Sequence, residues 1–285
     1  MTGSKGPSGI LLRRSPRRPW SLWPGLGGRG HRTAPASFPF RSGVEWPKGL
    51  LGPGAGMEKL YEGKAKILYP EGEHLRVYFK DEATAFNAQK RGVIPGKGVV
   101  NNKVSAALFR LLMAQGIPTH FLEELSDREM RVKRVEIIPL EVIVRYRAAG
   151  SFARRYGLEE GMPLRAPLVE FSLKNDALGD PLICKEAVLA LGLATEEEVE
   201  TLTRLALRTG EVLRAFFLER GLELVDFKLE FGRHGGEILL ADEISPDTMR
   251  LWDLKTGEPM DKDRFRKDLG GVEEAYQEVL RRVLG

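Results

Sequence analysis

Alternation of hydrophobic and polar residues predicts several β-strands between residue 57 and the C-terminus. The pattern is clearest in LVDFKLEFG (224–232), whose apolar side chains fall on one face of an extended chain. The opposite face carries two carboxylates and one amine, Asp226, Lys228 and Glu230. The segment is therefore either a half-exposed strand with a solvated charged face, or a strand whose charged face performs chemistry.

The same alternation, bounded by turn residues, predicts the other strands. One strand is predicted on either side of a tight turn at Gly63, and two more within 130–150, separated by a break at Pro139. The remaining predicted strands are 74–80, 224–231 and 237–241.

Helices are predicted where apolar residues recur at helical spacing. The longest, 195–221, has a capping box of Thr195 and Glu198 and ends at Gly221. The other predicted helices are 101–116, starting at Asn101 or Asn102 with Gly116 past its end, 151–157, capped by Ser151, and 272–284. Meandering strands mixed with helices, without strict βα alternation, predict an α+β fold.

Residues 1–56 differ in composition from the rest of the chain. They contain 12 Gly, 8 Pro, seven Arg and two Lys against one acid, Glu45. This composition predicts disorder, and we expect translation to begin at Met57; an organellar transit peptide is the alternative. GLGGRG (25–30) matches a dinucleotide-loop pattern, but no predicted strand precedes it and no helix follows.

The net charge of +4 comes from that tail, since the remaining residues carry 35 basic and 39 acidic side chains, a balance of −4. The composition therefore gives no reason to expect a nucleic-acid partner. The sequence contains no run of 18 apolar residues, so no membrane span is predicted. A single cysteine, Cys184, fits a reducing cytoplasm.

Candidate metal chemistry lies in the hairpin formed by 224–231 and 237–241. We expect a five-residue turn and a register that places Lys228 opposite Asp242 and Glu230 opposite Leu240. The side chains brought together would then be Asp226, Lys228, Glu230 and Asp242. A few carboxylate oxygens with room for water and phosphate suit Mg²⁺.

Several basic residues are candidates for anion binding. Lys64 and Lys66 in EGKAK follow a glycine between strands, either as a phosphate loop or as a solvated hairpin tip. Arg145 and Arg147 precede the helix expected at Ser151, either as an anion site or as a polar strand face. The segment GVIPGKGVVNN (92–102) lacks the glycine spacing of a Walker loop.

The segment SPDTMR (245–250) reads as an irregular acidic loop that ends at Arg250. The four histidines show no ligand spacing, and His74, His120 and His234 are expected in loops or at strand ends. Together, the residues indicate a phosphate-handling enzyme that uses Mg²⁺ and binds anionic substrates, without identifying those substrates.

Long ordered motifs make a resemblance specific. The chain resembles the SAICAR synthetase family in IIPLEVIVRYRAAGS (137–151), LVDFKLEFG (224–232) and DEISPDTMRLWD (242–253). The similarity extends to LYEGKAKILY (60–69), FNAQKRGVIPGKGVVNNK (86–103) and LKNDALGDPLI (173–183). It covers 57–285 and leaves out the tail.

The resemblance implies an ATP-dependent ligase of purine (IMP) biosynthesis that joins carboxyaminoimidazole ribonucleotide to L-aspartate, giving the succinocarboxamide SAICAR, ADP and phosphate. It implies ATP-binding residues Gly63, Lys64, Ala65, Lys66, Glu141 and Lys174. It implies Mg²⁺ ligands Glu230 and Asp242. It also implies two catalytic residues: Lys228, which would reach phosphate or the reacting carboxylate, and Asp247, near the imidazole. Arg145, Ser151 and Arg250 would hold the ribonucleotide phosphate.

The resemblance further implies two lobes: a nucleotide-binding lobe, 57–133, similar to those of protein kinases and ATP-grasp enzymes, and a larger lobe, 134–285. The enzyme is expected to be cytoplasmic. The sequence leaves its oligomeric state open, and a homo-oligomer is one of the alternatives. Two rival interpretations are a small-molecule kinase, which would need no aspartate, and a nucleic-acid-binding protein, which would depend on the basic tail.

Overall fold

The computed structural model describes residues 58–285; the predictions for 1–56 and for Met57 lie outside them. The first sheet is antiparallel, with the strand order β1-β2-β3-β7-β6. Its strands are β1 (Tyr61–Glu62), β2 (Lys66–Glu71), β3 (His74–Phe79), β6 (Phe121–Ser126) and β7 (Glu129–Lys133). The strands predicted around Gly63 and at 74–80 are confirmed.

The second sheet is also antiparallel, with the order β10-β9-β8-β11-β12, and β13 pairs with β11. Its strands are β8 (Glu136–Arg147), β9 (Pro163–Leu173), β10 (Leu182–Ile183), β11 (Leu222–His234), β12 (Glu237–Ala241) and β13 (Met249–Asp253). A separate hairpin consists of β4 (Glu82–Ala85) and β5 (Lys90–Val93).

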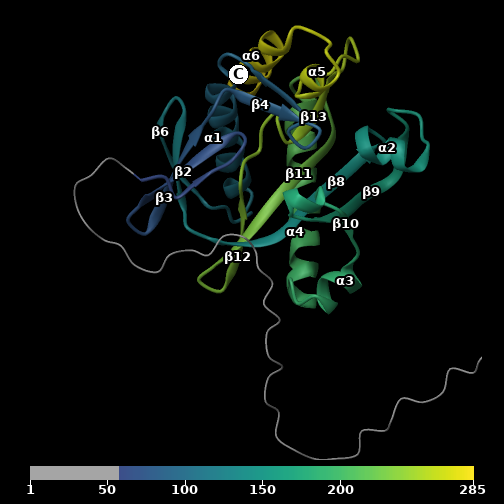
Figure 1. Ribbon diagram of the computed structural model, residues 1–285. Coiled ribbons are helices and arrows are strands. Elements are labelled where there is room, and N and C mark those ends of the chain that lie inside the picture. The colour runs from purple at the N-terminus through teal and green to yellow at the C-terminus, as the bar shows by residue number, and fades with distance from the viewer. Residues whose placement is uncertain (1–57) are drawn as a thin grey trace, which may run out of the picture. The chain divides into compact units, whose positions relative to one another are not determined.

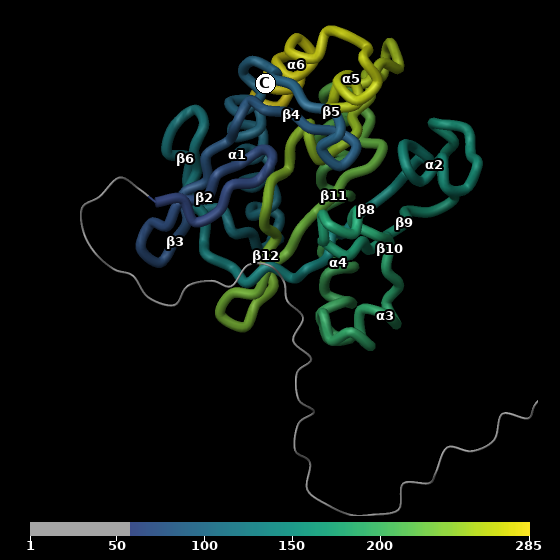
Figure 2. Tube along the Cα trace, in the orientation of Figure 1, coloured from purple at the N-terminus to yellow at the C-terminus, as the bar shows by residue number. Residues whose placement is uncertain are grey.

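Helices pack on both sheets (Figures 1 and 2). They are α1 (Lys97–Ala114), α2 (Gly150–Tyr156), α3 (Lys185–Ala190), α4 (Glu196–Leu218), α5 (Asp263–Arg266) and α6 (Val272–Leu284), with a short 3₁₀ helix, η1 (Asp176–Leu178). α1 packs on β3, β6 and β7 and against α6, whereas α4 packs on β8, β9 and β11. The mixture of helices with antiparallel sheets confirms the α+β prediction.

The main hydrophobic core is continuous across both sheets. Phe79 and Phe109 belong to it on the side of the first sheet, and Phe227, Phe231 and Tyr276 on the side of the second. All five side chains are at most 1% exposed. Within 58–285, no helix is long and apolar enough to cross a membrane.

Helix α1 begins earlier than predicted. It starts at Lys97 after Gly96, whose φ of 79° ends the preceding turn. Asn101 and Asn102 are therefore buried inside the helix rather than at its start; Asn102 Nδ2 donates 2.9 Å to the carbonyl of Ser126. The predicted end holds, since Gly116 follows the helix with a φ of 78°.

Pro139 does not break a strand, contrary to the prediction. β8 runs through it, and the break falls before Glu136. The pairing of β8 with β11 shifts register between Glu230 and Gly232, opposite Pro139. A bulge of this kind tolerates a proline inside a sheet because no ladder hydrogen bond is required from its nitrogen.

The caps of two helices turn out differently. The capping box of α4 is confirmed: Thr195 Oγ1 accepts from the Glu198 amide at 3.2 Å, and the Thr195 amide donates 2.9 Å to Glu198 Oε2. Ser151, by contrast, does not cap α2. Ala149 occupies the cap position without a side-chain hydrogen bond, and Ser151 is an exposed residue of the first turn.

The acidic hairpin is tighter than predicted. β11 and β12 are joined by two residues, Gly235 and Gly236, with φ of 57° and 83°, instead of five. Two successive left-handed residues suit a two-residue hairpin, and glycine adopts them without strain. The register is therefore one residue away from the expected one: Glu230 lies opposite Ala241, not Leu240, and Asp242 follows directly with a φ of 56°.

Candidate functional site

Four carboxylates and three lysines converge where β8, β11 and the end of β12 meet. Glu230 lies opposite Glu141 in the β8–β11 pairing, and Asp242 follows the last residue of β12. The ion pairs are Lys174 Nζ–Glu230 Oε1 at 2.9 Å, Lys228 Nζ–Glu141 Oε1 at 2.7 Å, Lys66 Nζ–Glu243 Oε1 at 2.7 Å, and Lys66 Nζ–Asp242 Oδ1. We call these residues the lysine–carboxylate cluster.

Asp226 does not join this cluster, contrary to the predicted four-residue group. It shares a strand face with Glu230, but four residues of extended chain separate the two by about 13 Å. Its carboxylate instead accepts from Arg145 at 3.1 Å and from Arg250 at 3.0 Å. Charged positions on one strand face therefore belong to two separate sites.

Desolvation and mutual repulsion affect the ionisation of buried Glu230 and half-buried Asp242. Burial, and then the nearby negative charge of Asp242, raises the pKa of Glu230, against the opposing effect of Lys174 and Lys228. Burial also opposes ionisation of Asp242, but Lys66, Lys228 and Lys174 outweigh it and lower the pKa of that carboxyl. The negative charges of the two carboxylates repel each other, and a bound cation would stabilise the ionised form of both.

His120 lies beside the cluster, although no role there was predicted for it from the sequence. Its ring Nε2 is 3.1 Å from the carbonyl oxygen of Asp242, and burial lowers its pKa to about 4. His120 therefore stays neutral near pH 7. The predicted positions of the histidines are confirmed, since His74 opens β3, His120 precedes β6 and His234 ends β11.

Two arginines form a second site, beside α2. Arg145 Nε also bonds Glu170 at 2.8 Å, and Arg250 Nε bonds Asp263 at 2.8 Å. Gly150, with a φ of +55°, opens α2, and a Cβ atom there would be 2.2 Å from an Arg250 nitrogen. The guanidinium of Arg250 therefore lies against the first turn of α2, next to Ser151.

Arg147, the other arginine named from that motif, does not join Arg145 and Arg250 in this site. It bonds Glu223 at 2.7 Å and the carbonyl of Gly161 at 2.8 Å. For Arg147 the structural interpretation, a polar strand face, is the better one.

The loop around Gly63 opens onto a cavity of about 490 Å³. Gly63 and Lys64 line it, and Lys64 Nζ lies 3.0 Å from Asp176. The backbone of Ala65 accepts from the Lys80 amide at 2.8 Å. Lys66 leaves this loop for the lysine–carboxylate cluster, so that one hairpin connects the cavity with the cluster.

Sequence reasoning missed two residues that contact Asp247. Lys97 Nζ lies 2.7 Å from Asp247 Oδ2, and the Tyr276 hydroxyl donates 2.5 Å to Oδ1. Lys97 lies in the segment 92–102, which lacks the glycine spacing of a Walker loop. The position of this lysine between two glycines was the one local feature that could have marked it as a site residue. No local pattern marks Tyr276, which lies in the middle of an ordinary amphipathic helix.

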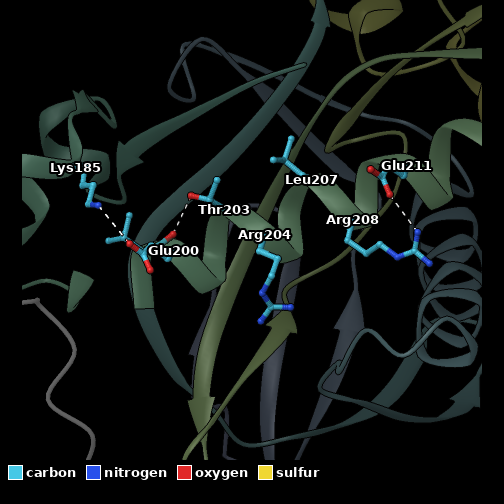
Figure 3. Close-up of a pocket in the computed structure, with 8 residues that line it drawn as sticks. Lys185, Glu200, Thr203, Arg204, Leu207, Arg208 and Glu211 are labelled. Atoms are coloured by element: carbon cyan, nitrogen blue, oxygen red, sulfur yellow. Dashed lines mark hydrogen bonds and ion pairs between the residues drawn. The ribbon is translucent and has the colours of Figure 1, made fainter. Parts of the chain in front are cut away.

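A larger hollow, about 630 Å³, lies on the surface of α4 (Figure 3). Lys185, Arg204, Arg208 and other polar residues line it, but none of the predicted site residues does. The Arg208 side chain pairs with Glu211 at 3.1 Å along the helix. We therefore place the candidate site at the cluster and the 490 Å³ cavity rather than at this hollow.

Comparisons with known proteins agree with the motifs. The model of the SAICAR synthetase family matches residues 59–283. The chain is 59% identical over 230 residues to the phosphoribosylaminoimidazole-succinocarboxamide synthase of Coprothermobacter proteolyticus, covering 80% of this chain and 98% of that protein. It is 56% identical over 229 residues to that of Lachnoclostridium phytofermentans, covering 80% and 97%.

Solved structures give the same result. A phosphoribosylaminoimidazole-succinocarboxamide synthase from Ehrlichia chaffeensis aligns with a TM-score of 0.78 at 44% identity, over 79% of this chain and 98% of that one. A SAICAR synthetase in complex with ADP aligns with a TM-score of 0.77 at 44% identity, over 79% and 97%. The chain thus belongs to the SAICAR synthetase family.

Proposed function

We propose that this protein is an ATP-dependent ligase of purine biosynthesis that joins carboxyaminoimidazole ribonucleotide and L-aspartate to give SAICAR, ADP and phosphate. The observation that carries the proposal is the pair of buried Glu230 and half-buried Asp242, with Lys66, Lys174 and Lys228 around it. Two proteins that are 56% and 59% identical to it over 229 and 230 aligned residues are named for this activity.

The nucleotide would lie between the 490 Å³ cavity and the lysine–carboxylate cluster. Gly63, Lys64 and Ala65 form the loop at the cavity, while Lys66 and Lys174 supply ammonium groups at the cluster. Glu141, which now bonds Lys228, completes the proposed nucleotide-binding set. A related SAICAR synthetase structure is a complex with ADP, which supports nucleotide binding by this chain.

The residues present fit Mg²⁺ held by Glu230 and Asp242. Among residues 58–285, no group of three or more His, Cys, Asp or Glu side chains could hold a metal by itself. Mg²⁺, however, usually takes one or two carboxylates together with substrate phosphates. Burial, and then the negative charge of Asp242, raises the pKa of Glu230, so a cation beside the two carboxylates would favour the ionised form of Glu230. When bound, Mg²⁺ supplies Lewis-acid neutralisation of the transferred phosphoryl charge.

The proposed chemistry needs positioning and charge neutralisation rather than a nucleophilic side chain. A carboxylate is a poor electrophile, so one oxygen of the ribonucleotide carboxylate first takes the γ-phosphoryl group of ATP, releasing ADP. The aspartate nitrogen then attacks the carboxyl carbon, the C–O bond to phosphate breaks, and the nitrogen loses a proton. Lys228, which bonds Glu141 in this structure, would neutralise the charge of the transferred phosphoryl group.

The ribonucleotide would lie between the two sites described above. Arg145 and Arg250, fixed by Asp226, would hold its phosphate together with Ser151 at the start of α2. Arginine forks match phosphate geometry. Asp247, in the loop between β12 and β13, would lie near the imidazole.

The finer architecture belongs to the same proposal. We propose a nucleotide-binding lobe at 57–133, similar to those of protein kinases and ATP-grasp enzymes, and a larger lobe at 134–285 with the metal and ribonucleotide sites. The division between β7 and β8 falls at this boundary. A single exposed cysteine, Cys184, supports a cytoplasmic enzyme, and a homo-oligomer remains compatible with the fold.

An ADP-release assay with product analysis tests the function. The full chain is incubated with Mg²⁺-ATP and carboxyaminoimidazole ribonucleotide, with and without L-aspartate. We expect SAICAR only when both substrates are present. ADP released at the same rate without aspartate, and no SAICAR, would contradict the ligase and favour the kinase interpretation.

A further inference from the structure

Three remote segments of the chain meet at the carboxylate of Asp247. Asp247 lies in the loop between β12 and β13, Lys97 is the first residue of α1, and Tyr276 lies in α6. Lys97 Nζ is 2.7 Å from Oδ2, and the Tyr276 hydroxyl is 2.5 Å from Oδ1. The side chains of Lys97 and Asp247 are 0% and 6% exposed, and Tyr276 is 1% exposed.

The loop itself supports this arrangement. The Asp247 amide donates 3.1 Å to Ser245 Oγ, and Ser245 Oγ donates 2.5 Å to Glu243. The Ser245 amide donates 3.1 Å to Thr248 Oγ1. Backbone and side chain of Asp247 are therefore held independently, the backbone by the loop and the carboxylate by the two helices.

The charged groups around Asp247 favour its ionised form. Burial opposes ionisation, but Lys97 and then Lys262 outweigh it and lower the pKa of the carboxyl. On the far side, burial and then Asp247 raise the pKa of Tyr276, with Asp261 adding to the effect. The phenol therefore stays protonated and can only donate to this carboxylate.

We infer that Lys97 and Tyr276 are positioning residues that hold Asp247 as an oriented hydrogen-bond acceptor for an N–H donor of the substrate's aminoimidazole ring. An ionised carboxylate accepts and cannot donate, and each oxygen keeps a lone pair after its bond to Lys97 or Tyr276. A donor on the ligand is thus the complementary group. The inference rests on the proposed function, because that function places the ribonucleotide at Asp247.

The orientation matters because a buried acceptor discriminates strongly against ligands that lack the donor. A site whose polar groups are left unpaired rejects such an analogue far more than a site with a missing apolar contact does. Lys97 and Tyr276 contribute to this discrimination without contacting the reacting atoms. Helix α6, although far from the other site residues in sequence, becomes part of the site through Tyr276.

Tyr276→Phe is the first test, since it removes one hydroxyl from the core and keeps the ring. We expect the KM for the ribonucleotide to rise about tenfold, the loss of one hydrogen bond to a charged acceptor, with kcat reduced less. Tyr146→Phe is the matched control: Tyr146 packs on Phe227 and under Arg214, and no contact joins it to Asp247 among the described residues. Its KM and kcat should equal those of the wild type.

Lys97→Met is the second test, and its readout is the pH profile of kcat/KM for the ribonucleotide. Removing the cation raises the pKa of Asp247, so the acceptor form is lost as the pH falls through that higher value. The ratio of wild-type to variant kcat/KM should therefore grow as the pH falls from 9 to 6. Burial, with the charge of Lys97 adding to it, lowers the pKa of Lys262 to about 8, so Lys262 titrates at a higher pH in Lys97→Met and is protonated in both proteins at pH 6.

Three outcomes are distinguishable. A wild-type protein that makes no SAICAR would overturn the proposed function and, with it, this inference. Active wild type with an unchanged ribonucleotide KM in Tyr276→Phe would overturn the inference alone. A Lys97→Met loss that is uniform with pH would indicate a purely structural lysine; where that variant fails to fold by circular dichroism, Tyr276→Phe decides the question.

Discussion

At the scale of single residues, the site depends on charges that the fold brings into pairs. Each carboxylate of the lysine–carboxylate cluster has an ammonium partner within 3.0 Å, as in the bond between Lys174 and Glu230. At the second site, Asp226 bridges the guanidinium groups of Arg145 and Arg250. Breaking one member of such a pair leaves the other uncompensated, which is costly where it is buried.

Glu230→Gln removes a proposed Mg²⁺ ligand while preserving shape. We expect kcat for SAICAR formation to fall by on the order of 10²–10³, as for the loss of one electrostatic stabiliser. The Mg²⁺ concentration needed for half-maximal activity should rise as well. Both quantities are measured by ADP release during a Mg²⁺ titration.

Glu237→Gln is the control for that variant, because Glu237 lies on the same hairpin, at the exposed start of β12. Its kinetics should match the wild type. Glu230→Gln activity within threefold of wild type at saturating Mg²⁺ would remove Glu230 from the metal site.

Gly150→Ala tests the second site. A Cβ at this position would lie 2.2 Å from an Arg250 nitrogen, so the guanidinium must move. We expect the KM for the ribonucleotide to rise about tenfold or more, because a displaced arginine loses a charge-assisted bond to phosphate. Steady-state kinetics with varied ribonucleotide measure this effect.

Gly157→Ala provides the backbone control. Gly157 has a similar φ of +62°, but nothing lies within 4 Å of the added Cβ. Both variants carry the strain of a left-handed alanine, on the order of 1–2 kcal/mol of stability. An equal change of KM in the two would mean that strain, not the displacement of Arg250, is responsible.

At the scale of elements, the start of α1 explains how Lys97 is held. Asp81 accepts from the amides of Gly96 at 3.2 Å and Gly98 at 2.8 Å, and bonds Arg128 through both guanidinium nitrogens. An anion at a helix N-terminus satisfies free amides and complements the dipole. The first turn of the helix, and Lys97 with it, is therefore tied to the connection between β3 and β4.

This anchor predicts a pH dependence of stability. The hydrogen bond from Arg128, together with those from the two backbone amides, lowers the pKa of Asp81 to about 2. Burial opposes this shift but is outweighed. Because the folded-state pKa lies below the unfolded one, the stabilisation is complete above about pH 4 and is lost as the pH falls towards 2. In Asp81→Asn, the free energy of unfolding at pH 7 should fall by on the order of 2 kcal/mol.

Urea titrations at a series of pH values measure that difference. The gap between wild type and Asp81→Asn should narrow between pH 4 and pH 2. A gap that stays constant down to pH 2 would show that the Asp81 carboxylate is not held in its ionised form by these bonds.

At the scale of the whole molecule, the C-terminal helix is part of both the core and the site. Tyr276, Val279 and Val283 of α6 are at most 5% exposed and belong to the main core. Removing 272–285 should therefore abolish activity and expose enough apolar surface to cause aggregation. Light scattering and the ADP-release assay detect the two effects.

Removing 1–56 is the matched truncation at the other end. The family match begins at residue 59, so we expect the shortened chain to retain its kcat and KM values. A loss of activity on this truncation, with the fold preserved by circular dichroism, would assign the N-terminal segment a role in catalysis.

Much of the fold could be predicted from local patterns. Period-two alternation identified β3 and β11, and the Thr195–Glu198 pair identified the start of α4, because these signals depend on neighbouring residues. Errors fell where a distant partner decides the outcome. Pro139 continues a strand because β11 accommodates it with a register shift, and α1 begins at Lys97 because Asp81 satisfies its first amides.

The sequence by itself determined the α+β class, the acidic hairpin and the family to which the chain belongs, since periodicity, glycine turns and long motifs are properties of the chain as written. Only the tertiary structure decided which charges meet. Asp226 joins two arginines rather than Glu230, and Asp247 meets Lys97 across 150 residues and Tyr276 across 29. Ion pairs depend on distances of a few ångströms between side chains, and strand register and helix packing set those distances.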